Sequence, residues 1–371
     1  MATDLRVLYA EPNFVGQAPE GTGRHTWGWA GADPAPQLGQ YAIKQLGLPT
    51  AWQSSQGAGV VVALLDSGVQ LDHPALADVW TVERYDFVAD DDNPGLAGTD
   101  TTTVAAGHGT HVAGIIHTVA PAARIMPLRV LDDEARGDIF QLAEAIIYAT
   151  DQGANVINMS LGTSEDSELL DEITNRATAR GVMVVAAAGN LGSKERQYPA
   201  ASSCVLAITA VNEKQQKADF ANYGSWLDLA APGVGIYSTL PPSGYGTWSG
   251  TSMATPWAAG EAALLYSLMA KLNRPLNVRQ LAELMIGTAR SVDGANPKYR
   301  GKLGAGVPAI DVALTRLQSG ALPEVGGVMS GSCLEFSENP LTGASPAVSS
   351  TVTNISTQSN RLFLPVIYSA H

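Results

Sequence analysis

The sequence predicts an α/β protein with a mostly parallel central sheet, and three observations lead to this prediction. Continuous apolar runs at residues 60–65 and 182–188 have the composition of strands buried on both faces, as parallel strands are. Segments of helical composition lie between such runs, which is the order of repeated βαβ units. With 371 residues, of which 45% are hydrophobic, the chain can bury a large core.

The N-terminal segment is expected to contribute little to that core. Residues 5–15 alternate weakly like a strand, whereas residues 16–40 are rich in Gly, Pro, Ala and Gln and are expected to form a linker. Residues 1–10 lack the basic start and the sustained apolar run of a signal peptide. Either the protein stays inside the cell or this chain is incomplete.

The first buried strand is expected to deliver a carboxylate to a site. The run at 60–65 ends at Asp66-Ser67-Gly68, and open α/β sheets place their sites at the carboxyl ends of the strands. An acidic loop follows at residues 89–106. Small residues at 107–116 then favour a tightly packed helix, which His108 opens.

The alternation of strands and helices continues along the rest of the compact part. Strands are expected at residues 125–130, 155–160, 182–188 and 205–210, and helices at 139–150, 167–180, 278–290 and 310–317. From about Ser319 the composition changes to Ser, Thr, Gly and Pro, so the C-terminal segment is expected to be an appendage.

Ser252 is the candidate nucleophile. It precedes an Ala/Leu-rich segment, residues 257–269, which predicts a helix of several turns with Pro256 in the first turn. At a helix N-terminus, unpaired N–H groups and the dipole favour developing negative charge, which suits acyl transfer. A serine also needs a base and a group that orients the base. Without those groups, Ser252 would be an ordinary residue at the start of a core helix.

Charge and hydropathy exclude several classes of partner. The formal net charge of −13 repels nucleic-acid phosphates and anionic membranes, so neither partner is expected. Glu261 interrupts the most apolar helix, and residues 362–368 are too short to cross a bilayer. Cys204 and Cys333 form neither a zinc pattern nor a disulfide framework, and their pairing stays open.

Three motifs together supply the groups that activate a serine. Asp66 lies in D-S-G, His108 in G-H-G-T-H and Ser252 in G-T-S-M-A-T-P. In this order they strongly resemble the motifs of the subtilisin-like serine proteases, or subtilases. The resemblance implies a three-layer α/β/α fold and a catalytic triad, in which Asp66 orients His108 and His108 accepts the Ser252 proton.

A fourth motif resembles the same family. Residues 186–190, Ala-Ala-Ala-Gly-Asn, are similar to the segment that carries the family's oxyanion-hole asparagine, so the resemblance assigns that role to Asn190. It also implies that substrate binds as an added strand. Gln197 is expected to narrow the far end of the main pocket. The residues implied in substrate binding are Arg136, Gly137, Ser160, Leu161, Gly162, Ala187, Ala188 and Gly189.

Residues 5–18 resemble the last strand of the propeptide that assists folding of many family members. The maturation cut is then expected between Gln17 and Gln40. The resemblance also implies a secreted monomer made as a zymogen. The expected domains are a propeptide remnant at 1–18, a linker at 19–40, a catalytic domain at 41–318 and an extension at 319–371.

No cofactor is expected for the chemistry, and calcium is expected only in a structural role. A cluster of acidic residues resembles a calcium loop of some family members, although Ala89 replaces one acidic residue. The alternative is a solvated acidic loop. The cluster consists of Asp86, Asp90, Asp91, Asp92 and Asn93.

A second metal hypothesis concerns the histidines. His108 and His111 lie three residues apart and could share a helix face, but no third ligand follows at a recognisable spacing. His111 is therefore expected to be a packed structural residue.

The sequence as a whole predicts a serine endopeptidase that acts on protein or peptide segments through an acyl-enzyme on Ser252. Its optimum is expected at neutral to alkaline pH, because His108 must be unprotonated to act as a base. Two alternatives remain. One is a peptide ligase or cyclase that uses the same acyl-enzyme, and the other is a non-catalytic peptide-binding protein of the same fold.

Overall fold

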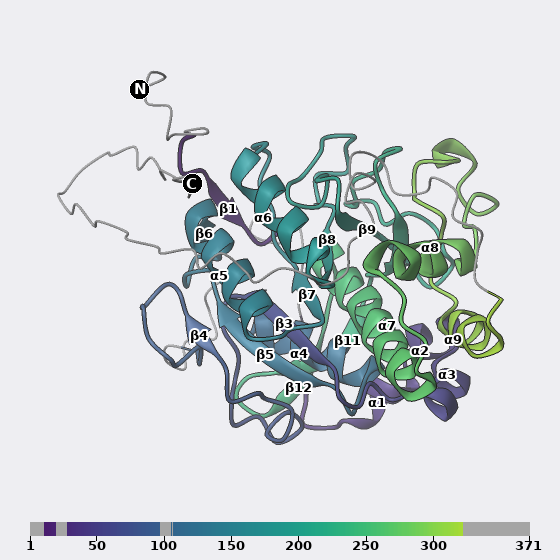
Figure 1. Cartoon of the computed structure of the whole chain (residues 1–371), viewed down its shortest axis with the longest axis horizontal. Helices are drawn as coiled ribbons and strands as arrows, with labels where there is room; N and C mark the ends of the chain where they lie inside the picture. Colours follow the sequence, from purple (N-terminus) through teal and green to yellow (C-terminus); the bar gives the residue numbers. More distant parts are fainter. Residues whose placement is uncertain (1–10, 20–27, 97–104, 106, 322–371) are drawn as a thin grey trace.

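A seven-stranded sheet lies at the centre of the computed structural model, which describes residues 11–19, 28–96, 105 and 107–321. All its strand pairs are parallel, in the order β10-β9-β8-β7-β3-β5-β4 (Figure 1). This confirms the predicted α/β architecture. The strands are β3 (Val61–Asp66), β4 (Tyr85–Asp86), β5 (Arg124–Arg129), β7 (Val156–Met159), β8 (Met183–Ala187), β9 (Val205–Val211) and β10 (Leu229–Pro232).

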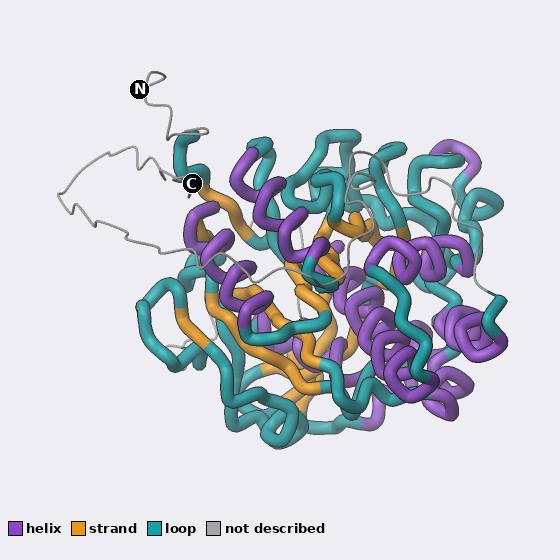
Figure 2. Tube along the Cα trace, in the orientation of Figure 1, coloured by secondary structure: helices purple, strands orange, loops and turns teal. Residues whose placement is uncertain are grey.

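Helices cover both faces of the sheet, and Figure 2 shows the strands gathered in the middle of the molecule. Val62 and Leu64 of β3 share one hydrophobic cluster with helices α4 and α7, whereas Ala63 and Leu65 share the other with α5 and α6. Alternate residues of a strand face opposite sides, so both faces of β3 must be apolar. The helices are α4 (His108–Val119), α5 (Ile139–Asp151), α6 (Glu168–Ala179) and α7 (Thr251–Leu272).

Side-chain caps fix where two of the predicted helices begin. Asp138 Oδ1 accepts a hydrogen bond from Gln141 N at 2.8 Å before α5. Asn277 and Gln280 form a reciprocal capping box at the start of α8 (Val278–Thr288). Such caps satisfy N–H groups that the first turn of a helix leaves unpaired. Further helical segments are α2 (Tyr41–Gln45), α3 (Leu48–Ser54), η2 (Pro297–Tyr299) and α9 (Ile310–Ser319).

The N-terminal segment differs from the expected linker. β2 (Gly28–Gly31) joins a second, antiparallel sheet of order β11-β12-β2, with β11 (Ile236–Leu240) and β12 (Gly244–Trp248). In α1 (Ala35–Gly39), the buried Gln37 donates from Nε2 to Thr118 Oγ1 at 2.7 Å. Composition alone missed this order, because it arises from pairing with strands and helices far along the chain.

A two-stranded antiparallel sheet joins β1 (Val15–Gln17) to β6 (Arg136–Asp138). The expected strand at residues 5–15 and the expected C-terminal extension lie largely outside the described residues, as does Cys333. Cys204 is buried and disulfide-bonded. Across the described ranges, every helix is too short or too polar to traverse a lipid bilayer.

Candidate active site

Asp66 and His108 meet where β3 ends and α4 begins. Asp66 Oδ1 lies 2.7 Å from His108 Nδ1, and both side chains are 1% exposed. Ser67 N donates to the same carboxylate oxygen at 2.8 Å. A Cβ at position 109 would lie 2.2 Å from Gly68 O, so only a glycine there lets α4 approach the aspartate turn this closely. The two motifs are therefore brought together as the sequence predicted.

Ser252 lies in the first turn of α7 and is fully buried. Its hydroxyl donates to Ser160 O at 3.1 Å, and Ser160 Oγ donates back to Ser252 O at 2.9 Å. Pro256 lies inside the helix, beyond the first turn where the sequence analysis placed it. Because proline has no N–H, it cannot supply the helical donor to Ser252 O, and Ser160 supplies one instead. The paired serines thus fix the start of α7.

Trp248, the last residue of β12, packs against both histidines of α4. Its ring meets the ring of His108 edge-on, with centroids 5.5 Å apart, and that of His111 at 5.7 Å. His111 is fully buried, and its Nε2 lies 3.1 Å from Ile236 O. His111 is therefore a packed residue that links α4 to β11, as the sequence analysis expected.

Asn190 follows β8 and lies beside the first turn of α7. Its Oδ1 accepts hydrogen bonds from Thr251 N at 2.9 Å and from Thr251 Oγ1 at 3.0 Å. Thr251 Oγ1 also accepts a bond from Gly189 N at 3.1 Å. These contacts fix the orientation of the amide, with its carbonyl end toward Thr251. Its Nδ2 end is then the side of the group that can donate to an oxyanion.

The predicted substrate-binding segments face each other across one added strand. Gln17 N donates to Gly162 O at 3.0 Å, and Gly162 N donates to Gln17 O at 3.0 Å. On the other side Gly16 pairs with Gly137, and Ala18 N donates to Ala135 O at 3.1 Å. Residues 15–18 therefore run between β6 and the segment after β7. Arg136 contributes its backbone there, while its half-exposed side chain pairs with Asp132 and Glu134.

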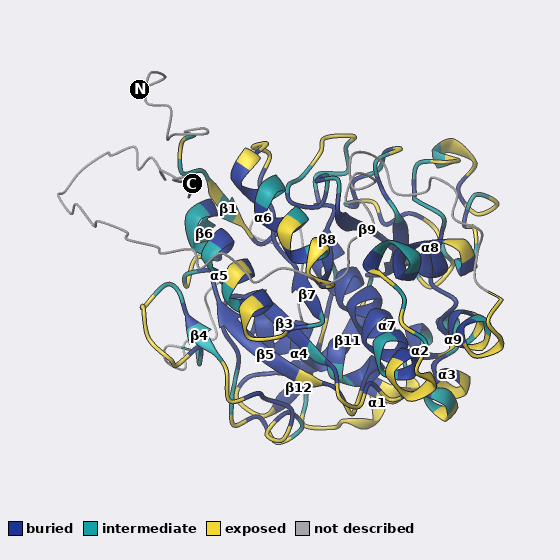
Figure 3. Cartoon of the chain, in the orientation of Figure 1, coloured by how far each residue is buried: buried dark blue, intermediate teal, exposed yellow. Residues whose placement is uncertain are grey.

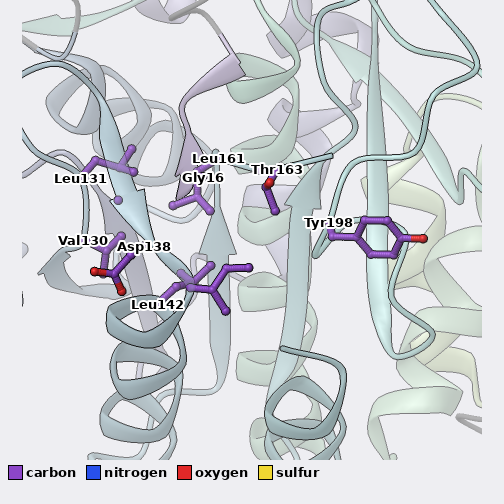
Figure 4. Close-up of a pocket in the computed structure, with 11 residues that line it drawn as sticks. Gly16, Val130, Leu131, Asp138, Leu142, Leu161, Thr163 and Tyr198 are labelled. Carbon is purple, nitrogen blue, oxygen red and sulfur yellow. The ribbon is translucent and has the colours of Figure 1, made fainter. Parts of the chain in front are cut away.

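An apolar pocket lies beside this strand (Figure 4). Leu131, Leu142 and Leu161 are among its lining residues, and Gly16 faces it without a side chain. A Cβ on Gly16 would have no atom nearer than Gly162 O at 3.5 Å, so the position has room for a larger residue. Leu161, one of the residues implied in substrate binding, thus lines this apolar pocket.

Gln197 lies between two glycines of the predicted main pocket. Its Cγ is 2.6 Å from where a Cβ of Gly189 would lie, and its Oε1 is 3.7 Å from where a Cβ of Gly162 would lie. Ala187 and Ala188 are fully buried beside this loop. The Gln197 side chain therefore lies close to both Gly162 and Gly189, and its place at the far end of the main pocket stays a prediction.

Two aspartates of the acidic loop have hydrogen-bond partners within the protein. Asp86 Oδ2 pairs with Arg129 Nη1 at 2.9 Å, while its Oδ1 accepts from Val88 N at 2.8 Å and Ala89 N at 2.9 Å. Asp90 Oδ1 accepts from Tyr85 OH at 2.6 Å. In the part of the chain that the structure describes, no three acidic, His or Cys side chains converge to hold a metal. These carboxylates stabilise a turn, and a structural calcium ion at this loop stays a prediction.

Two polar residues that support the site were missed by the sequence analysis. Thr251 holds the Asn190 amide, and its place next to Ser252 was a signal that could have identified it. Asn222 contacts the loop that carries Asn190, but its amide partners Ala188 and Glu195 lie 34 and 27 residues away in the chain. No local motif marks a contact of that kind.

Comparison with known proteins identifies the family. Residues 57–306 match the model of the subtilase family. Thermitase of Thermoactinomyces vulgaris is 42% identical over 245 residues, which cover 63% of this chain and 85% of thermitase. A thermophilic serine proteinase of Bacillus sp. (strain AK1) is 38% identical over 305 residues, or 79% of this chain and 70% of that protein. Subtilisin BL of Lederbergia lenta is 40% identical over 218 residues, or 56% of this chain and 77% of that protein. The chain therefore belongs to the subtilase family and is a subtilisin-like serine endopeptidase.

Proposed function

We propose that Ser252, His108 and Asp66 form the catalytic triad of this endopeptidase. The hydrogen bond of 2.7 Å between Asp66 Oδ1 and His108 Nδ1 carries the proposal, because it fixes the tautomer in which Nε2 is the basic nitrogen. Ser252 Oγ attacks the substrate carbonyl carbon as its proton passes to His108 Nε2. His108 then donates that proton to the leaving amine, and the acyl group stays on Ser252. Water next attacks the acyl carbon as its proton passes to His108, and His108 returns the proton to Ser252 as the acid is released. Subtilases need no cofactor for this chemistry.

Asn190 Nδ2 and the backbone N–H of Ser252 would donate to the oxyanion of each tetrahedral intermediate. The orientation of the Asn190 amide supports this role. Thr251 binds the amide oxygen, so the amide nitrogen is the end that faces away from Thr251. The position of Ser252 in the first turn of α7 also supports it, because the dipole of a helix favours negative charge at its N-terminus. Loss of such a side-chain donor lowers turnover about 100- to 1,000-fold, a range established on subtilisin itself.

Substrates would bind as extended strands, in the way that residues 15–18 lie between β6 and Gly162. The antiparallel register between this segment and the residues after β7 supports such binding. Gln17 lies opposite Gly162, so two residues further along Pro19 lies opposite Ser160, whose carbonyl accepts a hydrogen bond from Ser252 Oγ. We infer that the N-terminal segment fills the acyl side of the groove as the end of a propeptide. A maturation cut on the C-terminal side of Pro19 follows from that register.

The main pocket is proposed to favour small side chains before the scissile bond, because Gln197 lies near both Gly162 and Gly189. Family membership supports secretion of a monomeric enzyme made as a zymogen. We also propose that the catalytic domain spans residues 41–318.

The test compares purified wild type with Ser252→Ala in casein hydrolysis at about pH 8, which is above the ordinary pKa of about 6.5 for a histidine. A fluorophosphonate should label the wild type once, at Ser252, and leave the variant unlabelled. A folded wild type that neither cleaves nor reacts would favour a peptide-binding protein. Joined or cyclised products in the mass spectra would favour a ligase.

A further inference from the structure

Asn222 is a buried residue between β9 and β10 whose amide makes four hydrogen bonds to a single loop. Nδ2 donates to Ala188 O at 3.0 Å and to Glu195 O at 3.1 Å. Oδ1 accepts from Leu191 N at 2.9 Å and from Ser193 N at 3.3 Å. An amide offers two donor hydrogens and two acceptor lone pairs, so its hydrogen-bonding capacity is filled.

These bonds enclose Asn190 on both sides. Ala188 precedes it and Leu191 follows it, and the backbone N–H of Asn222 donates to Gly189 O at 3.0 Å. The loop has no strand or helix that would pair these groups, so a side chain must satisfy them. Asn222 thus supplies the hydrogen bonds that a neighbouring strand would otherwise supply to the loop that carries Asn190.

The packing around this amide is close and specific. Gly189 has φ = +95°, and a Cβ there would lie 2.9 Å from Asn222 Nδ2. The backbone of Asn222 is in turn held by β9, where Thr209 Oγ1 donates to Asn222 O at 2.6 Å. The central sheet, Asn222 and the loop therefore form one continuous set of hydrogen bonds that ends at Asn190.

We propose that Asn222 is a positioning residue for the oxyanion hole, acting through Asn190. The proposal rests on the role assigned to Asn190 above. Asn222 touches neither Ser252 nor His108 in the hydrogen bonds of the described residues, so its effect must pass through the loop. Because the amide of Asn190 has to point at an oxygen that carries charge only in the transition state, a small displacement lowers kcat more than it raises KM.

The chemistry of the contact requires an amide. Aspartate would have no N–H for Ala188 O and Glu195 O, and it would add a buried charge. Serine keeps a single hydroxyl, and alanine removes all four bonds. Asn222→Ser and Asn222→Ala therefore remove increasing numbers of hydrogen bonds at one position.

A double-mutant cycle tests the proposal. Asn222→Ala, Asn222→Ser and Asn190→Ala are made singly and in combination, and kcat and KM are measured on a peptide amide with active sites counted by fluorophosphonate titration. We expect Asn222→Ala to lower kcat about tenfold with KM within about twofold of wild type, and Asn222→Ser to lower it less. In the Asn190→Ala background, the same changes should lower kcat less than about twofold.

Asn296→Ala is the matched control. Asn296 is a buried asparagine that also braces a loop, accepting from Lys217 N at 2.7 Å and donating to Gln215 O at 2.8 Å. It should lower the melting temperature and leave kcat per active site unchanged. Equal losses of kcat from Asn222→Ala in both backgrounds would overturn the positioning role. If Asn190→Ala by itself leaves kcat unchanged, the oxyanion assignment fails and the role of Asn222 fails with it, which the single variant reveals separately.

Discussion

The two halves of α7 handle buried polar groups in opposite ways. In the first turns, Thr251, Ser252 and Thr255 are fully buried, and each hydroxyl has a hydrogen-bond partner. In the middle, Glu261 is equally buried, and neither of its carboxylate oxygens has a partner among the described residues. Figure 3 shows the helix buried along much of its length. Burial alone therefore does not distinguish the end of α7 that carries Ser252 from the middle of the helix, whereas hydrogen bonding does.

The difference appears in the charge of Glu261. Burial raises the pKa of this carboxyl to about 8, and Arg290 offsets the rise only in part. Arg290 is itself engaged with Asp311 Oδ1 at 2.9 Å and with Gln45 O. Glu261 is therefore mostly neutral at pH 7 and about half ionised near pH 8, and its burial affects stability rather than chemistry.

The largest expected effect is a loss of kcat from a substitution in the first turn of α7, where the hydroxyls have hydrogen-bond partners. Ser252→Ala should lower kcat at least about 10,000-fold, since it removes the proposed nucleophile, a range known from subtilisin and other serine proteases. Its melting temperature should stay close to that of the wild type. Ser267→Ala, at a half-buried position in the second half of α7, should keep full activity. Appreciable turnover by Ser252→Ala in a preparation free of wild type would refute the assignment.

Glu261→Gln should change the pH dependence of stability. A folded pKa of about 8, against 4.5 for the free group, means that its stabilising contribution is complete below 4.5 and is lost as pH rises toward 8. The loss amounts to several kcal/mol, at about 1.4 kcal/mol for each pKa unit. In a Ser252→Ala background that prevents autolysis, the Gln variant should therefore resist urea better at about pH 9 and little differently at about pH 5. Parallel pH profiles for both proteins would contradict this.

Ser160→Ala tests whether the Ser160 hydroxyl replaces the backbone donor that Pro256 lacks in α7. It leaves Ser252 O without its donor and should cost about 1–3 kcal/mol in the free energy of unfolding. Pro256→Ala restores a backbone N–H at the helical position, so it should recover part of that loss in the Ser160→Ala background. The four free energies are measured by urea titration. Strict additivity of the two changes would show that the serine hydroxyl does not substitute for the missing donor.

Gln197→Gly should give the smallest effect, a change in preference. Removing the side chain that lies near Gly162 and Gly189 should lengthen the main pocket and raise kcat/KM for a large residue before the scissile bond, relative to alanine, about tenfold. Paired peptide amides that differ only at that residue provide the measurement. An unchanged ratio would place Gln197 outside the pocket.

Much of the central sheet could be predicted from local patterns. The strands β3, β5, β7, β8 and β9 are apolar on both faces, because helices cover both sides, and this leaves continuous apolar runs in the sequence. β11, β12 and β2 have no such signal, since their antiparallel pairing is set by contacts between distant segments. The N-terminal linker was misjudged for the same reason.

The sequence by itself determined the family and the candidate groups at Asp66, His108, Asn190 and Ser252, because their motifs are short and contiguous. Only the tertiary structure decided how those groups are held. Ser160 replaces the donor that Pro256 lacks, Asn222 braces the Asn190 loop, and among the described residues the carboxylate oxygens of Glu261 have no hydrogen-bond partner. Each depends on which atoms long-range packing brings within about 3 Å, the reach of a hydrogen bond, and no local pattern encodes that distance.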